Sequence, residues 1–250
     1  WLRVHTSDGI ESLPVSGTAA VCSFHKNGAE WQQETSGIAA SMQMMLHPEL
    51  PILFRVCHVR NTGTRPVMLD WLAGQDVGLA DIGMLKNNEA YVCQYLDHRI
   101  VEHPVARKVV LSRNNLHPTN PFAVNCCLQG AQSASTDGYQ FFGTDYKLSG
   151  VPAALHTPAL ENRVRQYEFA YAALQTRTIE LQAGQSDTVV FALYVVKEHP
   201  QVSSTADLVL VDELLGAELP QPGQRLSDAS ANAFFAATPL LDAEALDEAQ

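Results

Sequence analysis

Acidic side chains concentrate in one glycine-punctuated segment of the chain, residues 74–98. Asp76, Asp81, Glu89 and Asp97 are of the type that performs acid–base chemistry on sugars, which needs two carboxyl groups about 5 to 9 Å apart across a glycosidic bond. Spacing along the sequence does not establish that distance. The alternative, that Asp76 and Asp81 hydrogen-bond backbone amides in tight turns beside the glycines, is favoured. We therefore assign no catalytic residue.

The same segment carries side chains that suit a hydroxylated ring. Amides donate and accept hydrogen bonds while aromatic faces cover the apolar side of a pyranose, so Asn88, Tyr91 and Gln94 are binding candidates. A purely structural role for them is equally open. The alternation of Tyr91 and Tyr95 with apolar and polar neighbours predicts a strand that presents both tyrosines on one face.

Other side chains are candidates for binding an anion, for binding a metal ion or for capping a turn. Arg113 presents a guanidinium fork either to an anion such as phosphate or to one of the loop carboxylates, and both remain open. Nine histidines are present, but no pair has H-E-x-x-H spacing, and we expect neither a metal site nor a cofactor. Asp137 is predicted to cap a tight turn that enters a strand.

Composition narrows the class of protein. The 250 residues carry a net charge of −11, which disfavours nucleic acid and anionic membranes as partners. No stretch has the length of an apolar membrane span. Five cysteines without a C-x-x-C pair suggest reduced thiols and a cytoplasmic protein.

Short apolar runs broken by Gly, Pro and Asn predict a large antiparallel sandwich. Residues 51–60 and 67–72 are predicted to form one hairpin, and residues 177–181 and 188–196 a second. Residues 139–143 and 167–171 are predicted to be short strands. Helical patterning begins only after residue 203, with Ser203 or Ser204 capping a helix over 207–215 and Ser227 opening another through 235.

Several long strings resemble the N-terminal region of glycoside hydrolase family 94. They are residues 75–81 (QDVGLAD), 87–98 (NNEAYVCQYLDH), 112–114 (SRN) and 136–143 (TDGYQFFG). The likeness is greatest to β-1,2-oligoglucan phosphorylases and the phosphorylase-like part of cyclic β-1,2-glucan synthases, and it covers about residues 45–200.

The resemblance implies a mainly β fold: a β-supersandwich like that of galactose mutarotase over residues 1–202, then a helical linker or tail over 203–250. That linker would lead into an (α/α)6 barrel, where such enzymes use a general acid and inorganic phosphate as co-substrate to cleave glucans with inversion. Nothing after residue 200 resembles that barrel, so the expectation is a fragment or a separate short chain without activity of its own.

We therefore expect a non-catalytic module of a β-glucan phosphorylase, a glycosyltransferase of carbohydrate metabolism. Its expected partners are a β-glucan oligosaccharide, the catalytic barrel and a second copy in a homodimer. The residues expected to contact substrate share the 74–98 segment or the strand after it: Gln75, Asp76, Asp81, Asn88, Glu89, Tyr91, Gln94 and Arg113. Two alternatives remain open: an epimerase of the mutarotase kind using His98 or His117 with Glu89, and a carbohydrate-binding module.

Overall fold

A computed structural model describes residues 1–7, 9–13, 20–35, 37–165 and 169–230. The strands in order are β1 (Leu2–Thr6), β2 (Gly9–Leu13), β3 (Val21–His25), β4 (Gly28–Thr35), β5 (Ile38–Leu46), β6 (Ile52–Asn61), β7 (Val67–Asp76), β8 (Leu96–His103), β9 (Arg107–Asn114), β10 (Phe122–Cys127), β11 (Ala131–Asp137), β12 (Ala170–Thr176), β13 (Ile179–Leu181), β14 (Ser186–Val196) and β15 (Arg225–Ser230). The helices are α1 (Ile82–Cys93), α2 (Gly138–Phe142), α3 (Tyr146–Ser149) and α4 (Val209–Gly216), with 3-10 turns η1 (Ala153–Leu155) and η2 (Thr205–Leu208).

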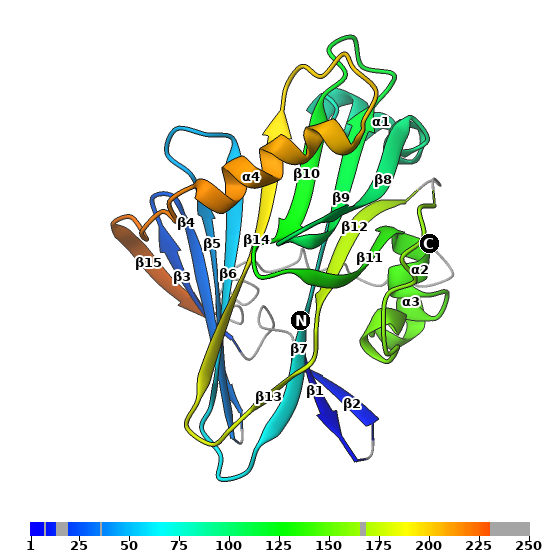
Figure 1. The fold of residues 1–250 in the computed structure, drawn as a ribbon. Coiled ribbons are helices and arrows are strands. Elements are labelled where there is room, and N and C mark those ends of the chain that lie inside the picture. Colours follow the sequence, from blue (N-terminus) through cyan, green and yellow to red (C-terminus); the bar gives the residue numbers. More distant parts are fainter. Residues whose placement is uncertain (8, 14–19, 36, 166–168, 231–250) are drawn as a thin grey trace, which may run out of the picture.

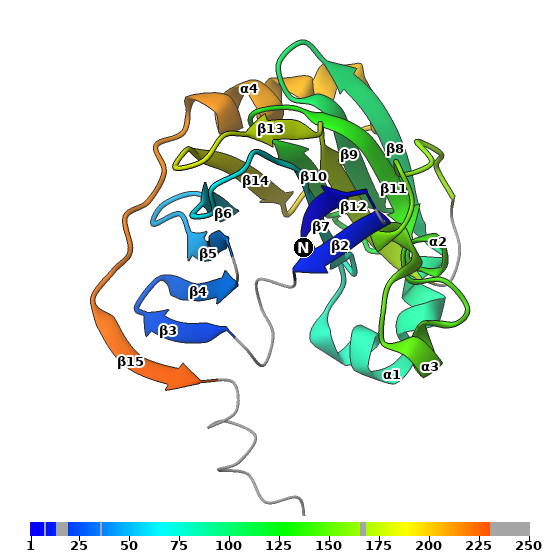
Figure 2. The same cartoon turned by 90° about the horizontal axis from the view of Figure 1, so that it is seen from below.

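The strands form one continuous hydrogen-bonded path that curls back on itself (Figures 1 and 2). Its order is β15-β3-β4-β5-β6-β14-β10-β9-β11-β12-β7-β1-β2, with β13 added to β7 and β8 to β9. Within the part of the chain that is described, every pairing is antiparallel except a single parallel contact between β9 and β11. The curl brings β7 to face β5 and β6, so the predicted mainly β sandwich is confirmed.

Alternation along the central strands separates two layers of core. On β14, Val189 and Phe191 point into the curl, where they join Trp71 of β7. Val190 and Ala192 point to the outer face, where they pack with other apolar side chains and with helix α4. A strand buried on both faces explains the unbroken apolar run that the sequence shows there.

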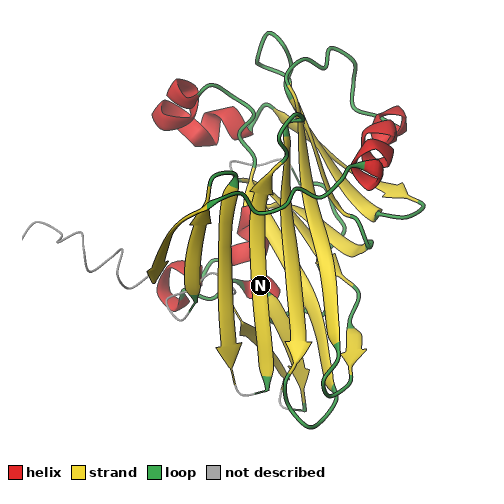
Figure 3. Ribbon diagram, turned by 90° about the vertical axis from the view of Figure 1, so that its left-hand side faces the viewer, coloured by secondary structure: helices red, strands yellow, loops and turns green. Residues whose placement is uncertain are grey.

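Helix α4 lies across the outer face of the sheet, as Figure 3 shows. The predicted helix over 207–215 is confirmed, beginning as the 3-10 turn η2 behind a capping box made by Ser204 and Asp207. Val211 and Leu214 are fully buried in the outer core. None of the helices in the described ranges has the length and apolar character needed to cross a bilayer.

Beyond α4 the chain returns to the sheet, because β15 pairs with β3. The predicted helix opening at Ser227 is therefore wrong over residues 227–230, and residues 231–235 lie outside the described part. The domain division at residue 202 stays a prediction, since nothing tests it; α4 and β15 both contact the sandwich.

Both predicted hairpins are wrong in their pairing, although all four strands exist. β6 pairs with β5 and β14, whereas β7 pairs with β1, β12 and β13. β13 likewise pairs with β7 and not with β14. In each case the connection crosses from one wall of the curl to the other, so neighbours in sequence face each other through the core and do not share hydrogen bonds.

Two short segments predicted as strands are helical. Residues 139–143 fall in and just after α2, and Tyr91 lies in α1. Asp137 is a cap as predicted, but of α2: its carboxylate accepts hydrogen bonds from the backbone N–H groups of Tyr139 (3.2 Å) and Gln140 (3.3 Å). The cap satisfies these two backbone donors at the start of the helix. This local stabilisation outweighs the apolar–polar alternation of residues 139–143, on which the strand prediction was based.

Candidate functional site

The end of β7 is built around the close approach of Gly74 and Tyr171. β12 pairs with β7 so that Tyr171 lies opposite Asp76, and its ring leans over Gly74. A Cβ added to Gly74 would stand 2.3 Å from the Tyr171 ring. Burial raises the pKa of the Tyr171 phenol, and nearby Asp76 raises it further. Gly74 is thus required so that a buried, neutral tyrosine can lie on the backbone.

Arg55 fixes the same strand end from β6. Its Nη1 donates to the carbonyl of Gly74 (3.2 Å) and its Nη2 to Oε1 of Gln75 (2.8 Å). Its Nε is buried and has no hydrogen-bond partner in the described structure. Burial lowers the pKa of Arg55. A partly desolvated guanidinium with one unused donor is a suitable group to hold an oxygen of a ligand.

A cavity of about 360 Å³ opens beside Arg55, between the facing walls of the curl. Trp1, Trp31 and Met42 are among the side chains that line it, together with Gly74. The aromatic rings and the guanidinium give it the mixed character of a small-molecule site, in which apolar walls carry a few convergent polar groups.

Asp76 and Glu89 place two carboxyl groups at the outer end of β7. Partial burial raises the pKa of Asp76, and the charge of Glu89 raises it further. Asp76 therefore binds a proton more readily than an ordinary aspartate, which suits a group that hydrogen-bonds a hydroxyl as donor or acceptor.

Aromatic rings cover the flank of this strand end. Phe142 packs against Phe169 (centroids 5.5 Å apart, stacked), Tyr171 (4.9 Å) and Tyr146 (4.6 Å). Tyr139 and Tyr146 keep 57% and 37% of their surface exposed. Helices α2 and α3 thus present partly exposed tyrosine rings that pack, through Phe142 and Phe169, on Tyr171 at the end of β7. Exposed aromatic faces of this kind suit the apolar side of a sugar ring.

Helix α1 follows the strand end and carries the other predicted tyrosine. It is kinked at Asn88 (φ −162°, ψ 77°), whose Oδ1 accepts a hydrogen bond from the backbone N–H of Tyr91 (3.0 Å). Tyr95 donates its hydroxyl hydrogen to the hydroxyl of Tyr91 (2.9 Å) across one helical turn, and their rings meet at 5.0 Å. The two tyrosines therefore do meet, across the turn that ends α1 and not on the predicted strand.

Asp81 stands at the start of α1 and makes no side-chain cap hydrogen bond. Its carboxylate lies 3.6 Å from Nε2 of His117, in a shallow groove that Lys197 and Glu198 also line. His98 is elsewhere: it is buried, bonds Ser112 through Nδ1 at 2.9 Å, and burial lowers its pKa to about 4. Of the two histidines expected to pair with Glu89, His117 instead faces Asp81, and His98 bonds a serine.

Arg113 is enclosed at the end of β9. Its Nε and Nη2 donate to the carbonyls of His199 (2.8 Å) and Pro200 (3.1 Å), and its Nη1 donates to Asn115. These acceptors are neither an anion such as phosphate nor a loop carboxylate, the two partners considered from the sequence. A substrate contact by Arg113 stays a prediction, as does one by exposed Gln94 at the end of α1.

The structure brings together only part of the predicted set. Gln75, Asp76 and Glu89 gather at the end of β7, Asn88 and Tyr91 lie along α1, and Asp81 and Arg113 lie apart from them. Sequence reasoning missed Arg55, Tyr171 and the aromatic flank. The sequence signal for these residues is a pair of glycines, Gly74 and Gly138. Each glycine lies beneath an aromatic ring, Tyr171 in the first case and Phe169 in the second.

The chain belongs to the SOGP N-terminal domain family, whose model matches residues 1–192. A curated relative is the 1,2-beta-oligoglucan phosphorylase of Listeria innocua serovar 6a, 31% identical over 206 residues. That alignment covers 81% of this chain but 18% of the relative, so the chain spans under a fifth of that protein.

Solved structures that align with part of this backbone include a polysaccharide lyase and an α-galactosidase. A polysaccharide lyase aligns with 79% of this chain and 25% of its own (11% identity, TM-score 0.44). The GH36 α-galactosidase AgaA of Geobacillus stearothermophilus aligns with 79% and 30% (8% identity, TM-score 0.38). The family match and the phosphorylase relative place the chain among modules related to carbohydrate-active enzymes.

Proposed function

We propose that the chain is the non-catalytic N-terminal module of a β-1,2-oligoglucan phosphorylase. It packs against the catalytic part of that enzyme and supplies one wall of the glucan site from the end of β7. The observation that carries the proposal is the family match, together with a phosphorylase relative of which this chain corresponds to 18%. In this reading phosphate and the general acid belong to the catalytic part.

The exposed side chains of helices α1 to α3 support a docking role. Large apolar residues stand out from these helices, with exposed fractions of 92% at Leu148, 69% at Ile82 and 57% at Tyr139. Figure 2 shows α1, α2 and α3 on one side of the sheet, away from α4. An apolar surface of this kind beside polar groups is typical of a protein–protein interface.

The carboxyl and tyrosine groups beside that surface support glucan contact. Asp76, Gln75 and the exposed ring of Tyr146 offer acceptors, donors and an apolar face within one strand end. Docking of a catalytic part over α1–α3 would enclose these groups in the wall of a cleft.

Reconstitution tests the docking. The chain is mixed with the catalytic part of the Listeria relative, meaning the region outside the aligned 206 residues, and complex formation is followed by gel filtration. Leu148→Asp should weaken the complex about tenfold or more, because burying a leucine is worth roughly 1.5–3 kcal/mol. Val209→Asp is the matched control, since Val209 is 56% exposed on α4.

Two outcomes would contradict the proposal. One is release of glucose 1-phosphate from β-1,2-glucan by the chain alone, which would place catalysis in the sandwich. The other is equal weakening of the complex by Leu148→Asp and Val209→Asp, which would remove the specific docking surface.

A second candidate function, a mutarotase-like epimerase, rests on the His117–Asp81 contact in its groove. Such an enzyme needs a histidine acid and a carboxylate base that converge within hydrogen-bond reach of a sugar C1–O5 unit. Polarimetry on α-D-glucose tests it. Mutarotation that the chain accelerates and that His117→Ala returns to the uncatalysed rate would favour the epimerase. Mutarotation at the uncatalysed rate in the presence of the parent chain would exclude it.

A further inference from the structure

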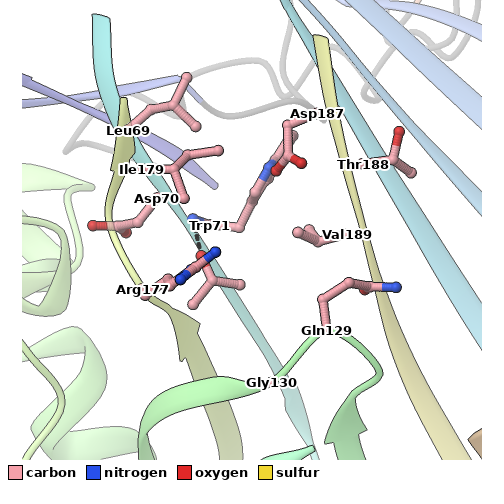
Figure 4. A pocket seen from close by; sticks show the side chains of 11 residues that line it. Leu69, Asp70, Trp71, Gln129, Gly130, Arg177, Ile179, Asp187, Thr188 and Val189 are labelled. Atoms are coloured by element: carbon pink, nitrogen blue, oxygen red, sulfur yellow. Dashed lines mark hydrogen bonds between the residues drawn. The ribbon is translucent and has the colours of Figure 1, made fainter. Parts of the chain in front are cut away.

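A second cavity lies along the first half of β7, where Leu69, Asp70 and Trp71 line it, and Trp71 also lines the cavity beside Arg55 (Figure 4). It has a volume of about 160 Å³ and is enclosed by β7, β13, β14 and the turn between β10 and β11. Its walls are apolar where they are deepest, with Leu69 of β7 and Val189 of β14 both buried. A cavity of about 150 Å³ accepts a six-membered ring such as benzene, so a single ring fits here.

The Trp71 indole is the main sign that this cavity takes a polar ligand. Trp71 is 2% exposed, and its Nε1–H has no hydrogen-bond partner in the described structure. In Figure 4 the indole extends from β7 into the space between β7 and β14. A buried N–H without an acceptor costs about 1–3 kcal/mol. An oxygen supplied by a ligand would satisfy it.

Three charged residues line the cavity: Asp70, whose carboxylate is paired with Arg3 at 2.8 Å, and Arg177 and Asp187, which have opposite signs. Arg177 follows β12 and Asp187 lies on β14, and neither side chain makes a hydrogen bond or an ion pair with any described residue. Arg177 is exposed and Asp187 half-buried, so they mark the mouth of the cavity. Their charges cancel, which favours a neutral ligand over an anion or a cation.

These groups define the chemistry of the occupant. The ligand must accept hydrogen bonds from Trp71 and Arg177, donate to Asp187, and present an apolar face to Leu69 and Val189. A hexopyranose meets all three demands, because each hydroxyl both donates and accepts while the ring C–H groups are apolar. We propose that this cavity is a binding site for one hexopyranose unit, separate from the glucan wall at the end of β7.

The test is an NMR titration of the whole chain with D-glucose, observed at the tryptophan indole N–H signals. The chain has three tryptophans, and Trp71→Phe identifies the Trp71 signal by its loss. Glucose should move that signal to lower field as the N–H gains an acceptor. Asp187→Asn and Arg177→Met should each weaken binding about tenfold, the value of one hydrogen bond to a charged group. Glu180→Gln, on β13 but outside the cavity lining, should leave it unchanged.

Alanine and inorganic phosphate serve as the competing probes. The proposal is overturned if the Trp71 signal stays in place up to about 100 mM glucose, a concentration that would detect even a very weak site. It is also overturned if alanine or phosphate moves the signal at lower concentration, which would make the occupant a zwitterion or an anion. Asp187→Asn should not alter docking to a catalytic part, so failure of this proposal and failure of the proposed function are distinguishable.

Discussion

Replacing Gly74 by alanine tests the packing on which the candidate site depends. The added Cβ would meet Cε1 of Tyr171 at 2.3 Å, Cζ at 2.7 Å and Oη at 2.8 Å. Ordinary carbon contacts are about 3.5–4.0 Å, so the ring must retreat by more than an ångström.

The ring has little room to retreat. Tyr171 is 5% exposed, and the centroids of Phe141, Phe142 and Phe169 stand 4.7, 4.9 and 5.9 Å from its own. Overpacking of a filled core costs about 1–3 kcal/mol, and the loss of glycine's freedom in the unfolded chain returns only about 0.4–1. We expect Gly74→Ala to lower the free energy of unfolding by about 1–2 kcal/mol.

Urea unfolding measures this, with Gly83→Ala as the matched control. Gly83 lies in α1 with open space around its missing Cβ, so alanine there should be neutral or stabilising by up to about 1 kcal/mol. The same substitution should therefore have opposite signs at the two positions.

A double-mutant cycle with Tyr171→Ala isolates the cause. Tyr171→Ala should cost less in the Gly74→Ala background than alone, because the clash has been removed. Equal stability of Gly74→Ala and the parent chain, or purely additive effects in the cycle, would refute the account of this strand end.

Three further predictions concern the frame around the site. Arg3→Met should lower the free energy of unfolding by about 3–5 kcal/mol, because it removes the two 2.8 Å hydrogen bonds of Arg3 and leaves the buried Asp70 carboxylate with His5 (2.7 Å) and Thr178 (3.3 Å) as its described side-chain partners. Arg99→Met, at an exposed ion pair, should cost less than about 1 kcal/mol, and equal costs would disprove the assignment. Ser204→Ala should cost about 1 kcal/mol in urea unfolding by removing the capping box, and an unchanged midpoint would count against it. His98 has a pKa of about 4 in the folded chain, below its unfolded value of about 6.5, so the unfolded state binds a proton that the folded state does not. The free energy of unfolding should therefore fall as the pH drops from about 6.5 to about 4. His98→Asn should reduce this fall, and an unchanged pH profile would show that His98 does not cause it.

The strands were predictable from the sequence and their partners were not. Residues 51–60 and 67–72 alternate as strands do, and both are strands. A short turn between two strands normally makes a hairpin, but here both strands bury a face in the same core from opposite walls. Periodicity reports which face is buried and carries no information on which backbone lies alongside.

The candidate site was found in part, for a related reason. The segment after β7 can be recognised from the sequence because its acidic and amide side chains are close together along the chain. Arg55 reaches the same point from β6, across the curl of the sheet, and Tyr171 reaches it from β12, which pairs with β7 although the two strands are far apart in sequence. In the sequence, this long-range contact leaves only one trace, the glycine at position 74. Why a glycine is needed there becomes clear only once the Tyr171 ring above it is known.

The most direct test of the central claim is the steady-state kinetics of the reconstituted enzyme with Tyr146→Ala. Tyr146 is 37% exposed and packs on Phe142, which packs on Tyr171 at the end of β7. Under the proposed function this ring contacts glucan, and phosphate is bound by the catalytic part. The account predicts a KM for β-1,2-glucan raised about tenfold, the value of one stacked aromatic contact of roughly 1–1.5 kcal/mol, with the KM for phosphate unchanged. Unchanged KM for glucan, or an equal rise in both KM values, would contradict the claim that this module forms a wall of the glucan site.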